Sequence, residues 1–154
     1  MNKIDKKIVK TSVKSLENLS ETEHKNLQNC LEKLEREELL YGVTYKLKVP
    51  KYEQSFYMTI NEQNGRPFEV FIESKAQELF PFLRVISLTL SAFLRTGLDI
   101  DFLLQEYKEI QDPTGGFRAK VKFLGDKSQY YSSLIALFAE VLDFHITKLK
   151  EIHQ

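Results

Sequence analysis

The sequence predicts an α+β fold in which a three-stranded antiparallel meander packs against helices. Between residues 43 and 72, apolar side chains alternate with polar ones, as in strands that bury one face. From residue 80 onward, apolar side chains recur every three or four positions, as on the buried sides of helices. A run of strands followed by a run of helices is typical of the α+β class.

The composition favours one globular domain. The chain has 154 residues, of which 42% are hydrophobic, enough for a single core. Lys and Arg together number 22, as do Asp and Glu, so the net charge is zero and we expect no nucleic-acid partner. No run approaches the ~20 apolar residues of a membrane span, and none near the N-terminus suits a signal peptide. We therefore expect a cytoplasmic protein that does not enter the membrane.

The N-terminal part predicts an arm and a helix. Residues 1–18 are rich in lysine and weakly patterned, so we expect a flexible basic arm. For residues 19–40 we expect an amphipathic helix, because Ser20 and Glu23 have the spacing of a capping box. One narrow apolar stripe follows, made of Leu27, Cys30, Leu31 and Leu34. Such a helix must dock either on its own domain, expected over 41–154, or on a partner.

Three strands are expected between residues 41 and 73. The side chains expected on the buried face are Val43, Tyr45, Leu47, Val49, Phe56, Met58, Ile60, Phe68, Val70 and Ile72. Alternation then leaves Tyr57 and Phe71 on the opposite face. With Arg66 at the adjoining turn, these aromatic residues are our predicted partner surface.

Three helices are expected after the strands. The first should start near Phe80, because Pro81 is tolerated in a first turn, and should end near Gly97. The second should span about 99–110. The last should run from just after Asp126 almost to the end of the chain, with His145 on its buried side.

The stretch QDPTGGFRAK, residues 111–120, leaves two alternatives open. Pro and Gly at these positions suit a tight corner. Glycine also lets backbone amides approach an anion, and an anion site here would use Thr114, Gly115, Gly116, Arg118 and Lys120. The stretch lacks both the Gly-Lys-Ser/Thr ending of a phosphate loop and the GxGxxG spacing, so turn chemistry favours the corner.

No catalytic or metal-binding set is visible in the sequence. The single cysteine, Cys30, excludes an internal disulfide and a Cys-rich metal site. His24, His145 and His153 are far apart, and His24 lies roughly on the opposite side of a helix from Cys30. We therefore expect no metal, no cofactor and no enzymatic activity.

Three stretches resemble one family. The segment YGVTYKLKVP…FYMTINEQNGRPFEVFIESKA carries Gly42, Thr44, Lys46, Thr59, Ile60, Asn61, Gly65, Pro67, Phe68, Glu69, Val70, Phe71 and Ile72. Arg95 and Gly97 follow, and then DPTGGF…YYSSLIALFAEVLDFHI. Together they resemble the TSCPD domain, the C-terminal accessory domain of adenosylcobalamin-dependent (class II) ribonucleotide reductases, which also occurs as a separate small polypeptide.

The resemblance implies an accessory protein that docks on a reductase catalytic subunit or a similar partner. The Thr-Ser-Cys-Pro-Asp string of the family is absent, and one cysteine cannot supply a redox dithiol. The chain should therefore not reduce nucleotides by itself. The alternative is a self-associating module, a homo-oligomer that binds a nucleotide or another anion through residues 112–122.

Overall fold

The three-stranded meander forms as predicted. The computed structural model describes residues 35–152, and there β1 (Tyr41–Lys48), β2 (Ser55–Gln63) and β3 (Arg66–Ser74) pair antiparallel in the order β1-β2-β3. Asn64 and Gly65 close the β2–β3 hairpin with positive φ angles of 55° and 71°, which is typical of a two-residue hairpin turn. The α+β class predicted from the alternating pattern is confirmed.

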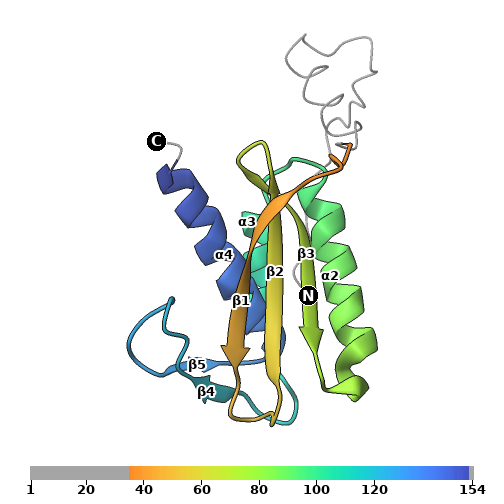
Figure 1. Cartoon of the computed structure of the whole chain (residues 1–154). Coiled ribbons are helices and arrows are strands. Elements are labelled where there is room, and N and C mark those ends of the chain that lie inside the picture. The colour runs from red at the N-terminus through yellow and green to blue at the C-terminus, as the bar shows by residue number, and fades with distance from the viewer. Residues whose placement is uncertain (1–34, 153–154) are drawn as a thin grey trace, which may run out of the picture.

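Helices follow the sheet. A 3₁₀ turn, η2 (Gln77–Leu79), leads into α2 (Phe80–Leu94), and α3 (Asp101–Glu109) comes next. A short hairpin of β4 (Phe117–Ala119) and β5 (Gln129–Tyr131) precedes α4 (Leu134–Ile152). Figure 1 shows α3 and α4 behind the sheet and α2 beside β3.

The last helix starts later than the sequence predicted. We expected it just after Asp126, but residues 129–131 form β5, which pairs with β4 in the register Phe117↔Tyr131. Ser133 explains the later start, since its hydroxyl accepts a hydrogen bond from the amide of Ala136 at 3.1 Å, as at a helix N-cap. Tyr130 and Tyr131 also belong to a residue type that favours strands.

The predicted N-terminal elements lie mostly outside the described residues. This applies to the arm over 1–18 and to most of the helix expected over 19–40. Residues 35–40 are described and are not helical, so a helix there would have to end before Glu35.

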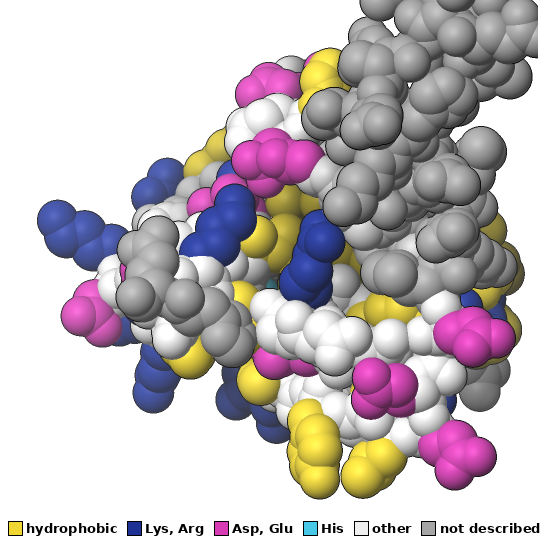
Figure 2. Space-filling model, turned by 90° about the horizontal axis from the view of Figure 1, so that it is seen from above, with side chains coloured by type: hydrophobic (Ala, Val, Ile, Leu, Met, Phe, Trp, Pro, Cys, Tyr) yellow, Lys and Arg dark blue, Asp and Glu magenta, His cyan; other side chains and the backbone are white. Residues whose placement is uncertain are grey.

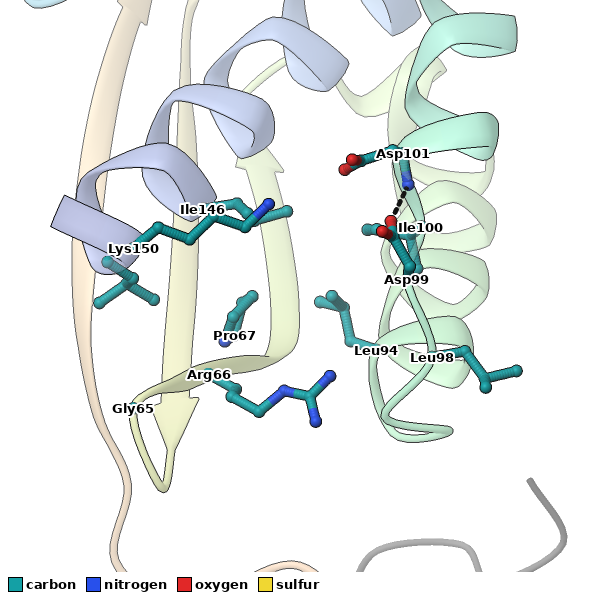
Figure 3. Close-up of a pocket in the computed structure, with 11 residues that line it drawn as sticks. Gly65, Arg66, Pro67, Leu94, Leu98, Asp99, Ile100, Asp101, Ile146 and Lys150 are labelled. Atoms are coloured by element: carbon teal, nitrogen blue, oxygen red, sulfur yellow. Dashed lines mark hydrogen bonds between the residues drawn. The ribbon is translucent and has the colours of Figure 1, made fainter. Parts of the chain in front are cut away.

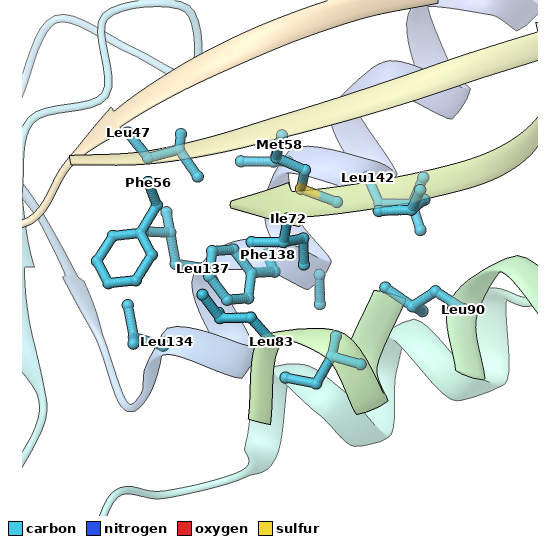
Figure 4. Close-up of a cluster of buried hydrophobic side chains, with 14 of the residues drawn as sticks. Leu47, Phe56, Met58, Ile72, Leu83, Leu90, Leu134, Leu137, Phe138 and Leu142 are labelled. Atoms are coloured by element: carbon cyan, nitrogen blue, oxygen red, sulfur yellow. The ribbon is translucent and has the colours of Figure 1, made fainter. Parts of the chain in front are cut away.

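The core lies between the sheet and the helices. Leu47, Phe56 and Met58 of the sheet are fully buried, as are Leu137 and Phe138 of α4. These side chains pack together in Figure 4, and the rings of Phe56 and Phe138 lie 5.9 Å apart. The predicted inward alternation is therefore correct for β2, β3 and the end of β1, but it was wrong for Val43 near the start of β1, which is 44% exposed.

Helix α2 covers the outer edge of β3. The hydroxyl of Ser91 accepts from the Val70 amide at 2.9 Å and donates to the Val70 carbonyl at 3.2 Å, while the Ser87 hydroxyl accepts from the Ile72 amide at 3.0 Å. Four residues of helix advance about 6 Å and two residues of strand about 7 Å, so the two spacings match. The serines thus satisfy edge amides that would otherwise be buried without a partner.

We predict that Ser91→Ala lowers the free energy of unfolding by about 1–3 kcal/mol, because the buried Val70 amide loses its acceptor. Urea denaturation measures this change. Thr89→Ala is the matched control on the same helix, because the Thr89 hydroxyl is exposed and bonds only to the Val85 carbonyl. Equal stability of the two variants would contradict the role assigned to Ser91.

Candidate functional site

The glycine-rich stretch forms a corner closed by Lys51. The Lys51 ammonium lies 2.8 Å from Asp112 Oδ2, 2.7 Å from Thr114 Oγ1 and 2.6 Å from the Gly115 carbonyl. The amide of Thr114 donates to Asp112 Oδ1, and that of Gly115 donates to the Asp112 carbonyl. The Lys51 hydrogen bond, with those from Thr114, lowers the pKa of Asp112 to about 2. The Asp112 carboxylate therefore already binds the Lys51 ammonium and the Thr114 amide, which a bound anion would need.

The backbone geometry of this corner requires glycine at positions 115 and 116. Gly115 has a φ of 93°, which side chains rarely adopt. A Cβ on Gly116 would lie 2.4 Å from the Tyr131 carbonyl oxygen, so a glycine lets the loop approach β5. Arg118 donates to the Ser128 carbonyl at 3.0 Å, and Lys120 is exposed. Of the two alternatives, the geometry favours the corner.

A cavity of about 290 Å³ opens where the β2–β3 turn, the α2–α3 connection and the last turns of α4 meet. Leu94, Ile100 and Ile146 are among its apolar lining (Figure 3). Figure 2 shows this end of the domain, where hydrophobic side chains lie between positively and negatively charged ones. The volume is at the lower end of the range for small-molecule sites.

Charged groups of both signs line this cavity. Among the residues that the structure describes, its charged lining is Arg66, Asp99, Asp101 and Lys150, and no Ser, Cys or His side chain belongs to that lining. Asp99 Oδ1 accepts from the Asp101 amide at 2.7 Å, which ties that carboxylate to the start of α3. This described lining therefore contains no Ser–His or Cys–His pair of the kind used in nucleophilic catalysis.

Arg66 belongs to this cavity and not to the outer sheet face. Its guanidinium donates to the Gly97 carbonyl on the α2–α3 connection. Tyr57 and Phe71, by contrast, do share the outer face, and each is 39% exposed. Lys46 lies 5.7 Å from the centre of the Tyr57 ring. The three residues proposed as one partner surface are therefore on two separate surfaces.

A groove of about 350 Å³ runs between the outer side of β3 and α2. Phe71 and Leu88 contribute apolar surface, and Arg84 and Arg95 lie on its helical wall. This groove was not predicted from the sequence, although Phe71 was predicted on the outer face of the sheet. The sequence does contain a pair of serines four residues apart on this helix, Ser87 and Ser91, but it does not show which strand they bond to.

Glu69 is the charged centre at one end of this groove. It is 1% exposed, and its carboxylate binds Arg36 at 3.0 Å, Arg95 at 2.9 Å and the Asn61 amide at 2.9 Å. Burial opposes its ionisation, but the hydrogen bonds from Arg36 and Asn61 outweigh burial and hold its pKa below the usual value. The cluster joins residue 36, β2, β3 and the end of α2.

A second polar cluster lies between the sheet and α4. His145 is 3% exposed, its Nδ1 is 2.8 Å from the Tyr45 hydroxyl, and its Nε2 is 3.1 Å from Glu62 Oε1. Burial lowers the pKa of His145, and the Glu62 carboxylate opposes that effect. Burial also raises the pKa of Tyr45, so neither group is activated for nucleophilic attack. The cluster links β1, β2 and α4.

Within residues 35–152, no three His, Cys, Asp or Glu side chains converge to hold a metal ion. The polar side chains of the two buried clusters instead contact one another.

Comparison with known protein families shows to which family this chain belongs. The model of the TSCPD domain matches residues 32–146, which contain the whole sheet and most of α4. The chain belongs to the TSCPD domain family. No curated protein and no solved structure matches it. The TSCPD domain that the sequence landmarks implied is thus confirmed.

We predict that His145→Gln makes stability less dependent on pH. The pKa of His145 is lowered in the folded chain, whereas in the unfolded chain it has the usual histidine value of about 6.5. The unfolded chain therefore binds the proton first, and the stability that a neutral His145 provides is lost as the pH falls below that value. Denaturation at about pH 7.5 and about pH 5.5 should show a smaller loss for the variant than for the wild type, because most carboxyl groups titrate below this window. Equal losses would contradict a buried neutral His145.

Proposed function

We propose that this TSCPD protein is a non-catalytic accessory protein that docks on the catalytic subunit of a ribonucleotide reductase. The membership of the family supports the choice of partner. The exposed side of α2 supports docking as the mode of action.

The observation that carries the proposal is an apolar stripe on α2. Phe82, Val85 and Phe93 are 38%, 62% and 45% exposed, and their spacing places them along one side of the helix. This side differs from the one that bears Ser87 and Ser91. A helix that is hydrophobic on two sides is normally covered on both, so the stripe has the character of an interface.

The apolar length of α2 also meets the requirement for a membrane span. Residues Gln77–Leu94 are long and apolar enough to cross a membrane, with a mean hydropathy of 1.2, and a third of them are buried in the domain. Ser87 and Ser91 bond to β3, and Leu83 and Leu90 are in the core, so leaving the domain would break both sets of contacts. We therefore favour a protein as the cover of the exposed stripe.

The test is co-purification of a reductase catalytic subunit with the tagged chain from its native host. Phe93→Asp should lower recovery by roughly 30-fold, because a central aromatic contact contributes about 2 kcal/mol or more. Tyr130→Asp is the matched control: Tyr130 is 62% exposed, and it lies on β5, outside α2.

Wild type and Tyr130→Asp should recover the subunit equally. If the wild-type chain recovers no reductase subunit, the proposed partner is wrong. If Phe93→Asp recovers as much as wild type while remaining folded by circular dichroism, the partner binds elsewhere.

A further inference from the structure

The groove between β3 and α2 is a second apolar surface, next to the stripe. Its middle contains Phe71 and Leu88, which are 39% and 56% exposed, with Ala92 beside them. A smaller hollow of about 60 Å³ shares Phe71 and Arg84 with it and extends it toward Phe80. Small and apolar residues along a helix allow a second helix to approach closely.

The described chain begins at one end of this groove. Arg36 binds the Glu69 carboxylate, which also binds Arg95 of the groove wall. On the other side of Arg36, Gln63 holds the backbone: its Nε2 donates to the Glu35 carbonyl at 2.7 Å, and its Oε1 accepts from the Glu37 amide at 3.1 Å. The residues that precede Glu35 therefore leave from beside the Arg95 end.

The length of the preceding segment fits the groove. From Arg84 to Arg95 the helical wall is eleven residues long, about 16 Å. A helix from Glu23 to Leu34 has the same eleven-residue span. Because Leu34 must lie near Arg95, the helix would run parallel to α2 and place Glu23 near Arg84.

The chemistry of the segment also fits. Its apolar positions, Leu27, Cys30, Leu31 and Leu34, form one narrow stripe, which suits a groove with a narrow apolar centre. Its first turn carries Glu21 and Glu23, which would face the guanidinium of Arg84.

We propose that residues 20–34 of this chain form a helix that docks in the β3–α2 groove, parallel to α2, with Leu27 and Leu31 against Phe71, Leu88 and Ala92. The helix covers the groove side of α2 and leaves Phe82 and Phe93 of the stripe open. The inference does not depend on the reductase partner, since both the groove and its occupant belong to one chain.

The native cysteine provides the test. In the full-length Ala92→Cys variant, Cys30 has only one other thiol to pair with. The docked helix would bring Cys30 close to position 92, within reach of a disulfide. Mild oxidation at low protein concentration should give a disulfide within the monomer, seen by non-reducing electrophoresis and mass spectrometry. Leu88→Cys is the second variant, with the same expectation.

The matched control is Lys127→Cys, an exposed position in the β4–β5 connection. Cys30 should pair at least about tenfold faster with the thiol introduced at position 92 than with the one at position 127, because docking raises the effective concentration of the thiols. Adding Leu31→Asp to Ala92→Cys should remove the difference, since the charge would enter the apolar groove.

Two results would overturn the inference. Equal pairing rates at positions 92, 88 and 127 would mean that the segment does not occupy the groove. Disulfides found only between two chains would mean that the occupant is a second copy. Neither result bears on recovery of the reductase subunit, so the two proposals fail separately.

Discussion

The hydrogen bonds between the hydroxyls of Ser87 and Ser91 and the edge of β3 fix where α2 lies on the sheet. An edge strand exposes amides and carbonyls that must find partners, and here a helix supplies them through two hydroxyls one turn apart. Once these serines align α2 along β3, the next position on the same side is Arg95, which meets Glu69 and lies over the Phe68 ring at 5.2 Å. The sheet edge, the helix and the charged cluster are thus one arrangement.

This alignment gives α2 three distinct sides. One side, with Leu83 and Leu90, enters the core, and the second forms the groove with Phe71. The third, next to the second, carries the exposed stripe that includes Val85 and Phe93. A helix used only for packing would need the first side alone. The other two sides are apolar without being buried within the described part of the chain.

The sequence predicted the elements whose cause is local. Alternation over residues 43–72 predicted the meander and the shared face of Tyr57 and Phe71, and Pro81 predicted the start of α2 at Phe80. It failed where distant residues decide: the pairing of β5 with β4 delays α4 to Leu134, and the Gly97 carbonyl draws Arg66 to the helical side. The role of the two serines could not be predicted either, because it requires knowing which strand is at the edge.

The most direct test of this account is native-state hydrogen exchange at the amides of Val70 and Ile72. Both belong to an edge strand, where amides normally exchange through small local openings. The account predicts that these two amides exchange as slowly as those of the central strand β2, and that Ser87→Ala with Ser91→Ala accelerates both. Fast exchange of Val70 and Ile72 in the wild-type chain would show that α2 does not seal the sheet.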